Sequence, residues 1–193
     1  MPKEKLIYFA TGNLHKFEEI RLILREFGVA TAILNVKSLE IQSDDLEEIA
    51  RTSVLHAVAA QRLPVIVEDA GLFIGVLNGF PGPYSSYVYR TIGLKGILKL
   101  LEKEDNRNAD FRSIIAFCRP GEAPKSFAGT VRGSISTVER GTHGFGFDPI
   151  FIPLGGDGRT FAEMAVIEKN LYSHRAQVAR KFAEWYARQS NNL

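Results

Sequence analysis

Four clusters of residues carry side chains that could perform chemistry. The first, TGNLHK at residues 11–16, follows a short apolar run and precedes a segment with helical spacing. Free backbone N–H groups and the helix dipole favour anions at such a helix N-terminus, where Asn13 and Lys16 add donors and positive charge. Because the GxxxxGK[ST] P-loop pattern is absent, this cluster by itself fits a capped helix with an exposed lysine better than a phosphate site.

The second cluster, Glu68-Asp69-Ala70-Gly71, follows the short apolar strand expected at residues 65–67. Carboxylates at the C-terminal end of a strand are natural ligands for Mg²⁺, which prefers oxygen atoms. A carboxylate at this place could also orient or deprotonate an attacking water. Taken alone, the cluster supports equally the alternative that the two acidic residues only turn the chain and cap the next segment.

The third cluster, GFGFDP at residues 144–149, interleaves glycines with aromatic rings. Exposed aromatic faces suit the stacking of a flat base. The cluster is not a dinucleotide fingerprint, because no third glycine and no strand-turn-helix context come after it. The alternative is a glycine-rich turn whose phenylalanines belong to the core, which is the usual role of an isolated aromatic pair.

The fourth cluster joins Lys169 and Asn170 to Ser173, His174 and Arg175, where the last helix is expected to begin. Cations at a helix N-terminus oppose the helix dipole, and a bound anion or carbonyl would relieve that conflict. The alternative is a solvated charged turn. Together the four clusters supply a phosphate cradle, a metal carboxylate, an aromatic platform and cationic donors. This combination favours a nucleoside triphosphate with Mg²⁺ as the ligand, and hydrolysis as the reaction.

Regular elements with short connections must position these clusters. Apolar runs and apolar residues at helical spacing predict strands at 6–10, 29–36, 65–67, 109–119 and 126–135, and helices at 17–27, 46–60, 94–101 and from 173 onward. The first strand, helix and strand suggest a parallel βαβ unit. The spacings of Asp44 with Glu47 and of Thr160 with Glu163 are those of a capping box. Because no repeat or linker interrupts the chain, we expect a single domain over residues 1–193, with any two lobes interwoven.

The composition excludes several classes of protein. The chain has 193 residues, 45% of them apolar, which is enough for a full core without disulfides or metals. Its net charge of +2 argues against a duplex-coating protein. The only cysteine, Cys118, excludes a CxxC zinc site and an intramolecular disulfide, and we expect it in the core. With no signal peptide and no stretch of about 18 apolar residues, we expect a soluble cytoplasmic protein that binds neither membranes nor nucleic acid.

Taken in order, the clusters carry a family resemblance. Five stretches between residues 11 and 177 contribute to it: TGNLHKFEEI, LEIQS, EDAGLFIGVLNGFPGPYSS, GFGFDPIFIP and TFAEMAVIEKNLYSHRAQ. They resemble the inosine triphosphate pyrophosphatase family of non-standard purine NTP pyrophosphatases. The resemblance implies an elongated α/β fold with a mixed sheet, two lobes that flank a deep nucleotide cleft, and a homodimer. It also implies Mg²⁺-dependent hydrolysis of ITP, dITP and XTP to the monophosphate and pyrophosphate, which removes deaminated purines from the nucleotide pool.

The resemblance implies catalytic and metal-binding roles for individual residues. Four residues of the first cluster would bind the phosphates: Thr11, Gly12, Asn13 and Lys16. Glu40 and Asp69 would bind Mg²⁺, and Glu68 is a candidate for an additional ligand. Asp69 would also be the base that aligns the attacking water, while Lys16 would stabilise the leaving pyrophosphate.

Other residues would recognise the base, according to the same resemblance. Five residues would line its site: Ala70, Phe145, Gly146, Phe147 and Asp148. Lys169, His174 and Arg175 would contact the nucleotide, and the last two would read the purine edge. A cationic donor such as Arg175 suits the carbonyl at the six-position of hypoxanthine or xanthine. Against the amino group of adenine it would leave a polar group unpaired, which discriminates strongly.

Three positions depart from the family's pattern. Ala70 replaces a common serine, Phe147 replaces a common tyrosine, and Leu39 stands where a proline often precedes the metal glutamate. None of these changes removes a charged catalytic group, so we expect activity. Two alternatives stay open: a pyrophosphatase with a broader range of nucleotides, and a nucleotide-binding sensor without turnover. The full set of acidic residues argues against the sensor, because a pure binder has no need of a carboxylate that activates water.

Overall fold

The computed structural model describes residues 5–36, 39 and 41–189, apart from the side chain of Lys5. Its strands are β1 (Lys5–Ala10), β2 (Val29–Leu34), β3 (Val65–Ile74), β4 (Pro81–Gly82), β5 (Asn108–Cys118), β6 (Lys125–Ile135) and β7 (Phe151–Pro153). Its α-helices are α1 (Leu14–Glu26), α2 (Leu46–Gln61), α3 (Ser85–Thr91), α4 (Gly93–Leu100), α5 (Val166–Tyr172) and α6 (His174–Gln189). Three short 3₁₀ turns are η1 (Gly75–Leu77), η2 (Asp148–Ile150) and η3 (Phe161–Glu163).

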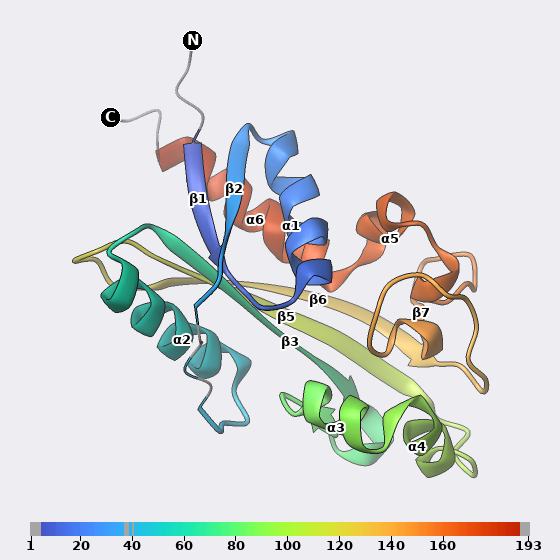
Figure 1. Cartoon of the computed structure of the whole chain (residues 1–193). Coiled ribbons are helices and arrows are strands. Elements are labelled where there is room, and N and C mark those ends of the chain that lie inside the picture. The colour runs from blue at the N-terminus through green and yellow to red at the C-terminus, as the bar shows by residue number, and fades with distance from the viewer. Residues whose placement is uncertain (1–4, 37–38, 40, 190–193) are drawn as a thin grey trace. The chain divides into compact units, whose positions relative to one another are not determined.

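The strands form one seven-stranded sheet in the order β2-β1-β3-β5-β6-β7, with β4 paired to β3 (Figure 1). Strand β1 pairs in parallel with β2 and with β3. In contrast, β4 runs antiparallel to β3, and β7 runs antiparallel to β6. Because α1 connects the parallel strands β1 and β2, the predicted βαβ unit is confirmed. The predicted α/β class with a mixed sheet is confirmed as well.

Strand β3 is longer than the sequence predicted. It does not end at Val67 but continues to Ile74, because Leu72 and Phe73 pair with β4 and extend the ladder. Glu68 and Asp69 therefore lie inside a strand, and the expectation that they follow its C-terminal end was wrong.

Two predicted helix caps had different outcomes. Asp45, and not Asp44, caps α2: its backbone is extended, and its carboxylate accepts a hydrogen bond of 2.8 Å from the backbone N–H of Glu47. The capping box of Thr160 and Glu163 is confirmed, since the Glu163 carboxylate accepts a hydrogen bond of 2.7 Å from the backbone N–H of Thr160. The turn that this box opens is the 3₁₀ turn η3 and not an α-helix.

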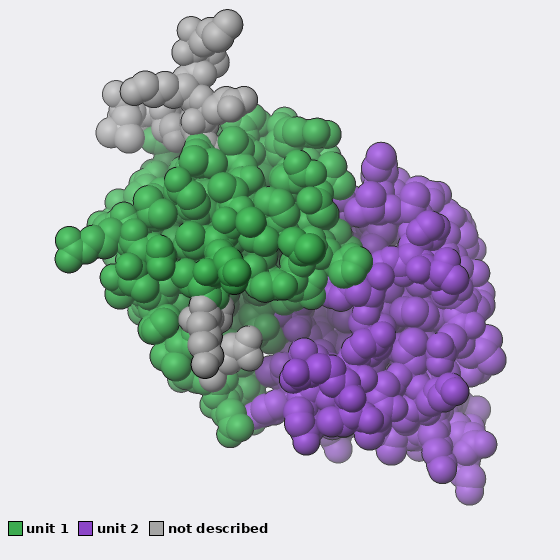
Figure 2. Space-filling view, in the orientation of Figure 1, with its two compact units in different colours: residues 1–69, 113–129, 175–193 green, residues 70–112, 130–174 purple. Residues whose placement is uncertain are grey.

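The chain divides into two compact units, which Figure 2 shows in different colours. Unit 1 comprises residues 1–69, 113–129 and 175–193. Unit 2 comprises residues 70–112 and 130–174. Each unit is thus assembled from separated segments, and strands β3, β5 and β6 contribute residues to both. The chain crosses from one unit to the other at two predicted pairs of site residues. One crossing lies between Asp69 and Ala70, and the other lies between His174 and Arg175.

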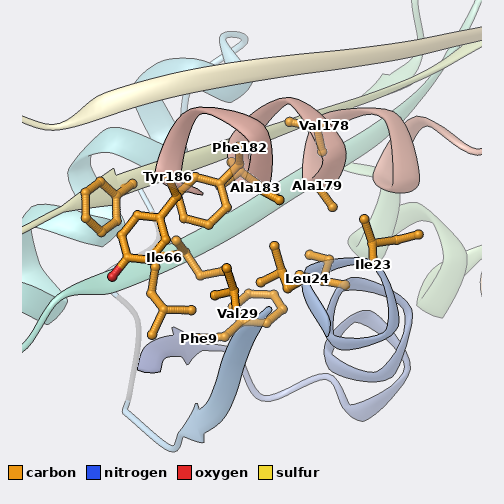
Figure 3. Close-up of a cluster of buried hydrophobic side chains, with 14 of the residues drawn as sticks. Phe9, Ile23, Leu24, Val29, Ile66, Val178, Ala179, Phe182, Ala183 and Tyr186 are labelled. Atoms are coloured by element: carbon orange, nitrogen blue, oxygen red, sulfur yellow. The ribbon is translucent and has the colours of Figure 1, made fainter. Parts of the chain in front are cut away.

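Unit 1 has an apolar core on each face of its strands. On one face, α1 and α6 pack against the strands through a buried cluster that includes Phe9, Ile23, Leu24, Val29, Ile66, Val178, Ala179, Phe182, Ala183 and Tyr186 (Figure 3). On the other face, α2 packs against Val65, Val67 and Cys118. Cys118 is therefore in the core, as predicted, and burial followed by the nearby Glu122 raises the pKa of its thiol.

Unit 2 has a core rich in phenylalanine. The ring of Phe151 lies between those of Phe111 and Phe161, with ring centres 4.6 and 5.2 Å apart. Tilted arrangements at these separations are favourable for aromatic pairs. This aromatic cluster supports the segments around residues 145–150 and 161–172, which carry predicted base-binding residues. Among the residues that the structure describes, no helix is long and apolar enough to cross a membrane.

Candidate active site

The loop from β1 into α1 carries the predicted phosphate-binding residues. Asn13 caps α1, and its side-chain oxygen accepts hydrogen bonds from the backbone N–H groups of His15 (3.0 Å) and Lys16 (3.2 Å). The Thr11 hydroxyl accepts a bond of 3.1 Å from the backbone N–H of Asn13. At Gly12 an added Cβ would meet no atom of the described residues within 4 Å apart from its two chain neighbours, so none of these contacts requires a glycine there.

Glu68 is the centre of a buried ion-pair network in unit 1. One carboxylate oxygen, Oε2, lies 2.9 Å from Lys16 Nζ. The other, Oε1, accepts hydrogen bonds from Arg175 Nε at 3.0 Å and from Ser113 Oγ at 2.6 Å. Arg175 also donates from Nη1 to Glu19 Oε2 at 2.6 Å. We call these five residues the Glu68 network; its two acids and two bases come from α1, β3 and α6, and its hydroxyl comes from β5.

The Glu68 carboxylate is ionised in this setting. Burial alone would raise the pKa of Glu68, but the charges of Arg175 and Lys16 and the hydrogen bond from Ser113 together outweigh it. The pKa of Glu68 therefore lies far below its ordinary value. The role of Glu68 as an additional metal ligand stays a prediction.

Glu68 and Asp69 point to opposite faces of β3. Successive side chains of a strand alternate between the faces of a sheet. Ile66 lies in the core beneath α1 and α6, whereas Val65 and Val67 lie in the core beneath α2. Glu68 shares the face of Ile66, and the half-buried Asp69 shares the face of the two valines. The two carboxylates therefore lie on opposite faces of the sheet, and the role of Asp69 as a ligand for Mg²⁺ stays a prediction.

The other predicted metal ligand, Glu40, lies outside the described residues. Its neighbour Leu39 is described, and the buried Ser53 of α2 donates a hydrogen bond of 2.9 Å to the Leu39 carbonyl. This bond anchors the chain next to Glu40 against α2, the helix that covers the face of Asp69.

Unit 2 holds a buried ion pair between Asp148 and Lys169. Asp148 Oδ2 lies 2.6 Å from Lys169 Nζ, and the two side chains are 4% and 2% exposed. The same oxygen accepts a hydrogen bond of 2.9 Å from the backbone N–H of Phe145. Lys169 Nζ lies 5.3 Å from the centre of the Phe145 ring and 5.4 Å from that of Phe161. Gly144 is required here, because its φ is +72° and an added Cβ would collide with the Asp148 carboxylate.

The two phenylalanines of the GFGFDP cluster differ in burial. Phe147 belongs to the core of unit 2, where its ring meets the edge of the Tyr89 ring with centres 5.6 Å apart. Phe145 is half-buried, so it is the ring with an accessible surface. His174 is buried and stacks on Phe111, with ring centres 4.6 Å apart and planes 13° apart.

The structure thus gathers the predicted site residues into two groups, one in each unit. Unit 1 holds Lys16 and Arg175 in the Glu68 network, while unit 2 holds Phe145 beside the Asp148–Lys169 pair. Two donors of Arg175, Nε and Nη1, are bound to carboxylates of its own unit. Its role in reading the base stays a prediction.

Sequence reasoning missed three residues that hold these groups: Glu19, Ser113 and Phe111. Glu19 lies three residues after Lys16, which places both side chains on one face of α1. Ser113 is a lone polar residue two positions before Ile115 on a face of β5 that is otherwise buried and apolar. A polar side chain on a buried face was the signal for Glu19 and Ser113, whereas nothing in the sequence pointed to the pairing of Phe111 with His174.

Comparison with known proteins identifies the family. The sequence profile of the Ham1 family matches residues 7–185. The chain belongs to the Ham1 family. A dITP/XTP pyrophosphatase of Methanopyrus kandleri is 52% identical over 180 residues, which cover 93% of this chain and 95% of that protein. A dITP/XTP pyrophosphatase of Saccharolobus solfataricus is 52% identical over 175 residues, which cover 91% of this chain and 90% of that protein.

Solved structures of this family share the fold. The structure of a HAM1 protein from Coxiella burnetii matches with a TM-score of 0.83 and 29% identity, and covers 95% of this chain and 99% of that chain. The Ham1 protein of Staphylococcus aureus matches with a TM-score of 0.81 and 27% identity, and covers 96% of this chain and 100% of that chain. The family resemblance that the sequence motifs predicted is therefore confirmed.

Proposed function

We propose that this chain hydrolyses non-standard purine nucleoside triphosphates, namely ITP, dITP and XTP, to the monophosphate and pyrophosphate. One observation carries the proposal: relatives named dITP/XTP pyrophosphatase are about half identical to the chain over nearly its whole length. The arrangement of the site supports it, because Lys16 is a partly exposed cation that suits a polyphosphate, and an ion pair beside an aromatic ring suits a base.

The loop before α1 would bind the phosphates. Lys16 would contact them with its ammonium group; its side chain is one-fifth exposed although it is paired with Glu68. Gly12 supports this assignment, because a backbone without Cβ admits a phosphate closely and the described residues leave open space at that position. Lys16 would then stabilise the pyrophosphate as it leaves. Positioning and electrostatics carry most of the catalysis in phosphoryl transfer, so no covalent intermediate on the protein is required.

Asp69 would hold Mg²⁺ together with Glu40, and Asp69 would also align the attacking water. The burial of Asp69 supports this, since Asp69 is half-buried whereas Glu68 is buried and engaged by Lys16, Arg175 and Ser113. Mg²⁺ would supply neutralisation of the triphosphate charge. Asp69 would accept a proton from the water as the oxygen approaches the α-phosphorus.

The base would be recognised in unit 2 and by the residues after Tyr172. Phe145 would stack on the purine, while Asp148 and Lys169 would offer an acceptor and a donor next to that ring. His174 and Arg175 would read the six-carbonyl that hypoxanthine and xanthine share. In this proposal Phe147 and Ala70 shape the site without donating hydrogen bonds from their side chains.

The experiment is a measurement of pyrophosphate release from ITP, XTP, dITP, GTP, ATP and dTTP, with Mg²⁺ and with EDTA. We expect Mg²⁺-dependent release largely confined to ITP, XTP and dITP. We expect Asp69→Asn to reduce kcat by about a thousandfold or more, because the group that aligns the water loses its basicity, while Asp110→Asn serves as a carboxylate control. Near-normal turnover by Asp69→Asn would contradict the assignment of the base, and equal release from all six nucleotides would contradict the role of Arg175.

The proposal extends to assembly and location. We propose a homodimer that works in the cytoplasm, where the nucleotide pool is consumed. Exposed apolar side chains around α3, including Tyr87 and Ile92, support a second copy as the partner, because such patches are typical of interaction surfaces. Light scattering on the purified chain tests the dimer, and a monomeric mass at micromolar concentration would refute it.

A further inference from the structure

The fully buried hydroxyl of Ser113 forms a short bond to a charged group. Ser113 lies on β5, directly beside β3 in the sheet, and its side chain faces the core of α1 and α6. Its Oγ donates a hydrogen bond of 2.6 Å to Glu68 Oε1. A buried hydroxyl without a partner is costly, and a bond to an ionised acceptor is about twice as strong as a neutral one. The contact therefore fixes where the Glu68 carboxylate lies.

The two oxygens of Glu68 hold different cations. Oε1, the oxygen that Ser113 fixes, accepts from Arg175 of α6, whereas Oε2 faces Lys16 of α1. A carboxylate on a flexible side chain could rotate and exchange these contacts. The hydroxyl of Ser113 selects one orientation, and so it sets the positions of both cations at once.

We propose that Ser113 is a positioning residue that, acting through Glu68, aligns Lys16 with the phosphates and Arg175 with the purine. This inference rests on the proposed function, in which the two cations bind opposite ends of the nucleotide. It adds that one carboxylate couples recognition of the two ends. Neither Ser113 nor Glu68 needs to touch the substrate.

The test compares Ser113→Ala with two matched variants. Ser113→Thr keeps the hydroxyl and should behave like the natural chain. Ser136→Ala removes another buried serine hydroxyl, which donates at 2.6 Å to the Val138 carbonyl of unit 2, far along the sequence from the network. If Ser113→Ala is insoluble, Ser113→Cys replaces it, because a thiol is close in volume and only a weak donor.

We expect Ser113→Ala to raise KM for dITP by about tenfold, the range for losing a hydrogen bond to a charged group. The inhibition constant of pyrophosphate should rise as well, and the preference for ITP over ATP should fall, while kcat changes by about twofold or less. Ser136→Ala should lower thermal stability and leave these three quantities unchanged.

A readout without turnover completes the test. The Nε–H of Arg175 should give a slowly exchanging signal in ¹H–¹⁵N NMR, because it is buried and bound to Glu68. The exchange of this Arg175 Nε–H proton with solvent should be faster in Ser113→Ala and unchanged in Ser136→Ala. Absence of turnover in the natural chain would refute the proposed function alone. Unchanged exchange, or unchanged KM and selectivity in an active Ser113→Ala, would overturn the role of Ser113.

Discussion

The two units hold buried charge in different ways. In unit 1 the Glu68 network spreads two positive and two negative charges over side chains from three elements, and Ser113 adds a hydroxyl. In unit 2 the acid Asp148 faces the base Lys169, whose ammonium lies near the rings of Phe145 and Phe161. In the network, Glu68 and Arg175 each contact two side chains of opposite charge, so each keeps one such contact when the other is lost.

This difference matches two kinds of ligand. A polyphosphate brings several charges, and a network that shares cations can redistribute them when such a ligand arrives. A purine base brings no net charge, and a closed ion pair next to an aromatic ring offers it fixed hydrogen-bonding directions. In the proposed function, the network would therefore serve the phosphates and the ion pair would serve the base.

The sharpest test of the comparison is the loss of one lysine from each unit. Lys169→Met should reduce the free energy of unfolding by about 3–5 kcal/mol, because it removes the cation that lies 2.6 Å from the buried Asp148 carboxylate. Lys16→Met should cost about 1 kcal/mol or less, since Lys16 is partly exposed and Glu68 keeps Arg175. Urea unfolding at pH 7 measures both. Equal losses would break the comparison.

A second test concerns Gly144, whose lack of a Cβ leaves room for the Asp148 carboxylate. Gly144→Ala should cost about 2–4 kcal/mol, because the left-handed backbone penalty adds to a collision with Asp148. Gly146→Ala is the matched control: its φ is +62°, but an added Cβ meets nothing within 4 Å, so only the backbone penalty of about 1–2 kcal/mol applies. Thermal unfolding distinguishes them. Indistinguishable melting temperatures would show that the carboxylate can move aside.

The smallest expected effect is the response of the Glu68 network to acid. The pKa of Glu68 is lowered in the folded state, so its contribution to stability is present above the ordinary value of 4.5 and is lost as the pH falls toward the folded value. Between pH 6 and pH 3 the natural chain should therefore lose about 2 kcal/mol that Glu68→Gln does not lose. Urea unfolding across this range checks the difference, and parallel curves for the two proteins would contradict it.

Much of the fold could be predicted because its signals are local. The apolar run before Thr11, the helical spacing after it and the capping pair at Thr160 and Glu163 each depend on neighbouring residues, and the structure confirms them. The end of β3 was wrong because pairing with β4 extends the strand. That pairing depends on residues about ten positions away, which no local pattern reports.

The electrostatics of the site could not be predicted for the same reason. Glu68 looked like a candidate metal ligand because it stands next to Asp69 in the sequence. Its partners Ser113 and Arg175 are 45 and 107 positions away. The alternation of strand side chains then separates the two neighbours onto opposite faces. Phe147 lies in the core of unit 2, as the alternative of a glycine-rich turn with core phenylalanines predicted.

The interleaving of the units has a consequence for how the protein is made. In unit 1, α6 covers the same face as α1, yet it leaves the ribosome after every other element of that unit. Until Phe182 and Tyr186 emerge, α1 is the only one of the two helices available to cover the apolar surface around Phe9 and Ile66, so part of that surface stays exposed during translation. Because each unit is assembled from separated segments, neither can be obtained by expressing one uninterrupted stretch of the gene.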